Sequence, residues 1–241
     1  MRILALLIAS CLTFPTGLVA QSAGLIITNS DYDFVGDERR GDRLAGSADR
    51  FEQAGMRMVT ARAANTQDMR DALSEFGQFA ATAETLFVGL SGKFIHTPTE
   101  TYYLPSDGQT APLATLTDNA LPLSTVFAWL SAKPGKAVLM LTTSNTAANY
   151  GPFDKGGIGE LDIPQGVTVV TGFPRASTSL INNHLSKPGK PFVRAAIQNN
   201  ELRVYSNAPR TMVFLDGVTE PPETADNRLE DIRAWRAAKD A

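Results

Sequence analysis

Five short apolar runs, separated by segments of helical periodicity, limit this chain to few architectures. The runs are four to seven residues long and fall at residues 24–28, 56–60, 84–90, 137–141 and 167–170. Apolar runs of this length are typical of strands that are covered on both faces. Strands that alternate with helices favour a parallel sheet between two helical layers. The sequence therefore predicts an α/β fold of three layers, with a mostly parallel central sheet and helices on both faces.

The segments between the first three runs predict helices. Leu44, Ala48 and Phe51 recur at helical spacing. Thr66 can cap the second helix, and Asp68 lies in its first turn, where a negative charge suits the helix dipole. Beyond these, the sequence predicts a hairpin-like insert near residues 102–105, helices over 121–130, 179–186 and 192–197, and strands over 202–205 and 211–215.

The beginning of the chain has the pattern of an export signal. Arg2 is the only charged residue before Asp31, and an apolar stretch with small residues at its end follows Arg2. This order is typical of a secretory signal peptide. We therefore expect residues 1–20 to be removed, residues 21–218 to form one domain and residues 219–241 to form a charged tail. The expected location is the periplasm or the extracellular space, with no transmembrane span in the mature chain.

The single cysteine lies within this leader segment. Cys11 follows Ile8-Ala9-Ser10, which also fits a bacterial lipoprotein cleavage pattern, so lipid attachment at Cys11 is an alternative to simple cleavage. If cleavage follows Ala20, the mature chain contains no cysteine. It can then form no disulfide, no thiolate metal site and no cysteine nucleophile.

Charge and histidine content exclude several classes of function. The formal net charge of −3 gives no reason to expect a nucleic-acid partner. The two histidines, His96 and His184, are far apart and have no carboxylate cluster at ligand spacing. The sequence therefore predicts no metal site and no cofactor.

Several motifs appear in order between residues 24 and 173. Asn29-Ser30-Asp31-Tyr32 follows the first strand, residues 66–76 read T-Q-D-M-R-D-A-L-S-E-F, and residues 102–107 read Y-Y-L-P-S-D. These resemble the GNxxY turn, the T-x-x-x-M-R-x-A-L-x-x-F helix and the Y-L-L-P-x-D segment of the caspase-like cysteine peptidases, a group that includes bacterial metacaspase relatives. The resemblance implies a three-layer caspase-like sandwich with its cleft at the carboxyl ends of the strands.

Two departures from that family pattern decide what the resemblance implies for function. The family's third strand ends in S/A-G-H-G, whereas this chain has Ser91-Gly92 followed by Lys93 and Phe94. The family's cysteine follows the fourth strand. Here Thr143 stands nearest to that place, or Ser144 if the register slips by one. The resemblance therefore implies a caspase-like domain that has lost both its catalytic cysteine and its catalytic histidine.

The hydroxyls at the cysteine's place leave a second possibility open. A threonine or serine hydroxyl needs a base to act as a nucleophile. Lys93 could be that base if burial lowered its pKa, as in serine–lysine pairs; otherwise it is a solvated loop residue. His96 could replace it only after a change of register, and otherwise His96 and His184 are surface residues.

The resemblance also implies a cleft around the degenerate positions. Phe94, Asp107, Asn145 and Phe173 are the residues expected to line it. For Asp107 the alternative is a loop carboxylate that accepts backbone N–H groups. Two functions follow: a pseudo-peptidase that binds a peptide or protein partner, or a hydrolase that uses Thr143 or Ser144 with Lys93 or His96. The sequence does not indicate an oligomeric state.

Overall fold

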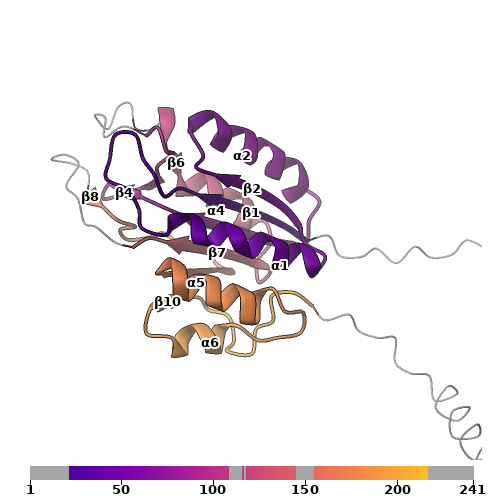
Figure 1. The fold of residues 1–241 in the computed structure, drawn as a ribbon. Helices are drawn as coiled ribbons and strands as arrows, with labels where there is room; N and C mark the ends of the chain where they lie inside the picture. The colour runs from indigo at the N-terminus through magenta and orange to yellow at the C-terminus, as the bar shows by residue number, and fades with distance from the viewer. Residues whose placement is uncertain (1–21, 109–115, 117, 145–154, 217–241) are drawn as a thin grey trace, which may run out of the picture.

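The computed structural model describes residues 22–108, 116, 118–144 and 155–216 (Figure 1). The expected signal peptide with Cys11, the predicted cleft residue Asn145 and the charged tail over 219–241 lie outside the described residues. In the described part, no helix is both long enough and apolar enough to span a bilayer.

A sheet of six strands forms the centre of the domain, in the order β10-β9-β7-β3-β1-β2. All neighbouring strands are parallel except β10, which runs antiparallel to β9. The predicted mostly parallel sheet is therefore confirmed. The strands are β1 (Ser22–Thr28), β2 (Arg57–Arg62), β3 (Thr85–Ser91), β7 (Ala137–Thr142), β9 (Val167–Gly172) and β10 (Leu202–Tyr205).

Helices cover both faces of this sheet. The helices α2 (Thr66–Ala80) and α4 (Leu123–Ser131) pack on one face, in a core with Leu25, Val88 and Leu139. The other face packs against η1 (Gly41–Ser47), α1 (Ala48–Gln53), α5 (Pro174–Leu180), the π-turn η2 (Ile181–Leu185) and α6 (Val193–Gln198). Figure 1 shows α2 above the sheet and α5 and α6 below it. The α/β fold of three layers is confirmed.

A second, smaller sheet extends from the carboxyl end of β3. It is antiparallel, in the order β6-β5-β4-β8. Its strands are β4 (Phe94–His96), β5 (Thr101–Tyr103), β6 (Leu121–Pro122) and β8 (Lys155–Gly156). The predicted hairpin-like insert is the pair β4 and β5.

Some helix and strand boundaries differ from the sequence prediction, because a capping side chain or the pairing of strands sets them. The cap of α2 is Asn65 rather than Thr66: its side chain accepts the N–H groups of Gln67 and Asp68, and Asp68 accepts the N–H of Asn65. The helix expected over 121–130 begins only at Leu123 because the two preceding residues pair with β5. The strand expected over 211–215 is reduced to one bridge, between Val213 and Pro191.

Asn29 holds three chain segments together at the carboxyl end of the sheet. Its side chain is fully buried. The amide nitrogen donates to the carbonyls of Ala64 and Leu104, at 3.3 and 3.1 Å, and the amide oxygen accepts the N–H of Ala64 at 2.6 Å. The segment after β1, the loop before α2 and the end of β5 are therefore fixed relative to one another.

Candidate binding site at the carboxyl edge of the sheet

The carboxyl ends of four parallel strands lie at one level. The register pairs Thr28 with Ser91, Ser91 with Thr142 and Thr142 with Gly172. The segments that follow these strands carry the residues that the sequence singled out. In an open α/β sheet, ligands bind at this edge, so the site is described from here.

A buried carboxylate occupies the centre of this edge. Glu38 belongs to the loop between β1 and η1 and is 1% exposed. Its Oε1 accepts the backbone N–H of Ser144 and the hydroxyl of Thr143, the latter at 3.5 Å. Gly41 fixes the loop, because a Cβ there would collide with the carbonyl oxygen of Asn29. The positions that resemble the family's cysteine therefore face a glutamate side chain.

Lys93 is buried, which corrects the interpretation of it as a solvated loop residue. It is 6% exposed, and its ammonium nitrogen lies 5.9 Å from the centre of the Tyr32 ring. Its backbone N–H donates to the Tyr32 hydroxyl at 2.7 Å. Gly92 permits this contact, since a Cβ there would collide with the same hydroxyl oxygen. The backbone that follows β3 therefore packs directly against the Tyr32 hydroxyl.

The second candidate base, His96, is held on the small sheet. Its Nδ1 lies 3.0 Å from the carbonyl oxygen of Gly157, and its ring packs against Gly159. His184 lies in η2, on the helical layer formed by α5 and α6, with its Nδ1 3.1 Å from the carbonyl oxygen of Pro191. The ring contacts of both histidines in the described chain are thus with backbone oxygens.

The hydroxyl of Tyr103 lies beneath this edge as a buried donor. It donates to the carbonyls of Ser91 and Ile27, at 2.9 and 3.3 Å. Burial raises the pKa of Tyr103 well above its usual 10.0, and the nearby Tyr32 and Glu38 raise it further. Tyr103 is therefore a permanent structural donor and not an acid available for proton transfer near neutral pH.

This burial predicts a loss of stability at alkaline pH. The folded chain keeps the Tyr103 proton while the unfolded chain releases it near pH 10, so the free energy of unfolding falls as the pH rises above about 10. We expect urea midpoints to decrease between pH 8 and about pH 11, and to decrease less in Tyr103→Phe. An equal decrease in both proteins would contradict the assignment.

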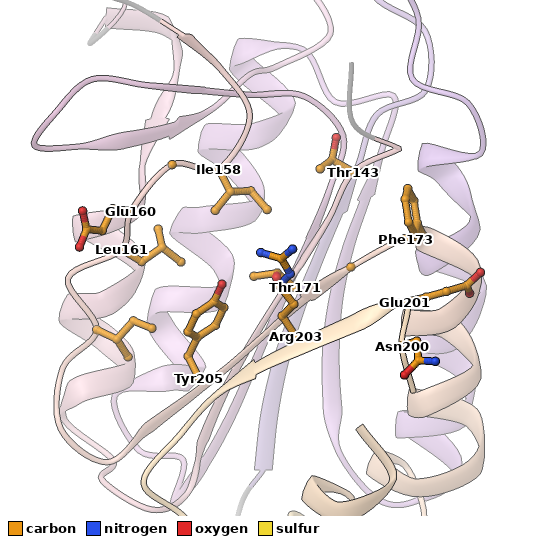
Figure 2. Close-up of a pocket in the computed structure, with 13 residues that line it drawn as sticks. Thr143, Ile158, Glu160, Leu161, Thr171, Phe173, Asn200, Glu201, Arg203 and Tyr205 are labelled. Atoms are coloured by element: carbon orange, nitrogen blue, oxygen red, sulfur yellow. The ribbon is translucent and has the colours of Figure 1, made fainter. Parts of the chain in front are cut away.

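An open groove of 610 Å³ crosses the edge near β9 and β10. Figure 2 shows Arg203 and Tyr205 of β10 pointing into it, with Leu161 opposite and Thr143 and Phe173 at its upper end. Phe173 is 46% exposed and Tyr205 is 44% exposed, so both present aromatic surface to solvent. The groove therefore combines apolar wall residues such as Leu161 with the carboxylates of Glu160 and Glu201, and the Arg203 guanidinium lies at its centre.

A second pocket of 470 Å³ adjoins the groove and is lined mainly by arginines. Arg39 and Arg40 come from the loop that carries Glu38, and Arg175 comes from the first turn of α5. Ser144, Phe173, Pro174 and Glu201 complete the lining. Phe173 and Glu201 line both spaces, so the groove and the arginine pocket adjoin each other. Three guanidinium groups against one carboxylate make this pocket suited to an anionic group.

The structure distributes the predicted cleft residues over different environments. Phe173 lines both the groove and the arginine pocket. Phe94 lies in the core, 2% exposed, with its ring centre 5.3 Å from that of Tyr103. Asp107 accepts the backbone N–H and the hydroxyl of Thr66, at 2.8 and 2.9 Å, and so satisfies the first turn of α2. The alternative stated for Asp107, a loop acceptor, describes these contacts.

Sequence reasoning missed the residues that give this site its charge. Along the chain, Glu38, Arg39 and Arg40 stand in a polar, charged segment without a motif, and Arg175 is far from them in sequence. The available signal was the adjacency of Glu38, Arg39 and Arg40 in a loop that follows a buried strand, where α/β folds place ligand contacts. Only the fold brings Arg175 to them.

Comparisons with known proteins add a likeness of fold. The structure is similar to that of the Drosophila initiator caspase Dronc, with 81% of each chain covered, a sequence identity of 10% and a TM-score of 0.45. Neither a protein-family model nor a curated protein matches the sequence. At this level of identity and superposition, the likeness carries no information on activity, ligand or site residues, and the function has to be argued from the site.

Proposed function

We propose that this chain is an exported caspase-like pseudo-peptidase that binds a segment of a peptide or protein and does not cleave it. The observation that carries the proposal is that the groove and the arginine pocket adjoin at Phe173 and Glu201, which line both. The groove offers apolar walls for an extended segment, and the pocket offers guanidinium groups for an acidic side chain of that segment.

The chemistry around Thr143 supports binding without cleavage. The only cysteine of the chain, Cys11, lies in the expected leader. Glu38 accepts both the Thr143 hydroxyl and the Ser144 N–H. A carboxylate at this place would repel the oxyanion that forms when a carbonyl is attacked. The geometry therefore disfavours acyl transfer at the hydroxyl cluster.

A direct experiment combines binding and turnover on residues 21–241. Fluorescent peptides that differ only by Asp or Asn at one position would be titrated by anisotropy, and the same mixtures analysed for cleavage by mass spectrometry. We expect tighter binding of the Asp peptides and no cleavage products in the wild type or in Thr143→Ala. Cleavage by the wild type that Thr143→Ala abolishes would overturn the proposal.

The hydroxyl–carboxylate contact favours one alternative, a hydrolase in which Glu38 is the base for Thr143. The Thr143 Oγ1 lies 3.5 Å from Glu38 Oε1, and the Glu38 carboxylate could accept the Thr143 proton as the hydroxyl attacks a carbonyl carbon. A fluorophosphonate probe tests this: an adduct on Thr143 that is lost in Glu38→Gln would establish the hydrolase, and absence of an adduct across pH 5 to about pH 9 would exclude it.

A further inference from the structure

A row of buried hydroxyls crosses the carboxyl edge of the central sheet. The side-chain oxygens of Thr28, Ser91 and Thr142 are buried, and none has a hydrogen-bond partner within the part of the chain that the structure describes. The register places these three residues side by side on β1, β3 and β7. Buried polar atoms without partners are uncommon and require an explanation.

The three hydroxyls point to the same face of the sheet. Side chains of a strand alternate between faces, so Thr28 shares its face with Ile26, and Thr142 shares its face with Met140. Both of these apolar residues belong to the core beneath η1 and α5. Ser91 shares its face with Phe87, which is in the same core. The row therefore lies on the η1 side of the sheet.

Glu38 reaches from the loop after β1 to the segment that follows β7. Its Cγ lies 3.3 Å from the Cβ position of Gly41, beside the end of β1, while its Oε1 contacts Thr143 and Ser144 after β7. Since β3 lies between β1 and β7, the carboxylate lies over the end of β3. The second oxygen, Oε2, is buried and also has no partner among the described residues.

We propose that this cluster is a binding site for a monovalent hard cation, sodium or potassium. Its ligands would be Glu38 Oε2 and the hydroxyl oxygens of Ser91 and Thr142, which are paired on neighbouring strands, whereas Thr28 lies two strands from Thr142 and outside the reach of the same ion. Buried carboxylates are normally paired with a cation or coordinate a metal ion. Among the described residues, the salt bridge joins Lys136 to Asp216 and does not involve Glu38.

The ligand chemistry decides the class of ion. Carboxylate and hydroxyl oxygens are hard ligands, which suit alkali and alkaline-earth cations rather than transition metals. Calcium sites use several carboxylates, whereas this cluster contains one carboxylate and two neutral hydroxyl oxygens. The hydroxyls lie on the η1 face of the sheet, whereas the groove lies over the opposite face, with Leu161 and Ile163.

Thermal unfolding of residues 21–241 tests the site. The measurement compares sodium, potassium and choline chlorides at equal ionic strength, so that general screening is constant. We expect the melting temperature to be higher by about 5 °C in saturating sodium or potassium than in choline, and to rise with the logarithm of the cation concentration.

Three variants separate a bound ion from a general salt effect. Thr142→Val removes one ligand while filling the same volume, and Glu38→Gln removes the charge; both are expected to lose the difference between sodium or potassium and choline. Ser47→Ala removes a buried hydroxyl without a partner from η1, two turns beyond Gly41, and should retain the difference. An equal melting temperature of the wild type in all three salts, or a cation dependence that persists in Thr142→Val, would overturn the proposal.

Discussion

The variant Asn29→Ala is expected to lower the free energy of unfolding by about 4 kcal/mol, because three buried backbone groups lose their only side-chain partner at once. These groups are the N–H and the carbonyl of Ala64 and the carbonyl of Leu104. Urea denaturation followed by circular dichroism measures the change.

Asn65→Ala is the matched control for this variant. Asn65 also uses its side-chain oxygen to accept two backbone N–H groups, but it is exposed at the start of α2. Water can satisfy the groups that it releases, so we expect a loss of about 1 kcal/mol. If the two variants lost equal stability, Asn29 would not have the joining role described for it.

The double variant Arg39→Ala/Arg175→Ala is expected to weaken binding of an acidic peptide about 100-fold, since each guanidinium contributes a charge-assisted hydrogen bond. Anisotropy titration with the Asp and Asn peptides measures this loss. The difference between the two peptides should disappear, because the variant no longer distinguishes a carboxylate from an amide.

Arg194→Ala provides the control for that loss. Arg194 is exposed on α6 and does not line the groove or the arginine pocket. The substitution removes one positive charge outside the site. The affinity for the acidic peptide should therefore change by less than about twofold at moderate salt. Wild-type affinity of the double variant would mean that the acidic group is recognised elsewhere.

The layers of the fold could be predicted because the information is local. Runs such as residues 137–141 are short and wholly apolar, and in the structure every residue of β7 is buried. The helix α2 was recognisable from Met69, Ala72 and Phe76, which form its buried face. Its cap was assigned one residue too late, because Asn65 and Thr66 are both good capping residues.

The site could be predicted only in part because its contacts join distant segments. Glu38 and Ser144 are separated by 106 positions, and nothing in the sequence around either residue predicts their contact. Lys93 was interpreted as solvated because lysines are rarely buried, yet Gly92 and Tyr32 enclose it. Phe173 lines the groove because it directly follows β9, the last parallel strand.

The arginine pocket depends on strands that are not neighbours. Arg39 and Arg40 follow β1, Arg175 follows β9, and β3 and β7 lie between those strands in the sheet. If any of these four strands is not paired in the sheet, Arg39 and Arg40 are no longer held next to Arg175. Ligand affinity therefore reports whether the sheet is completely formed: an anionic partner would bind only fully folded molecules and would protect them from proteolysis.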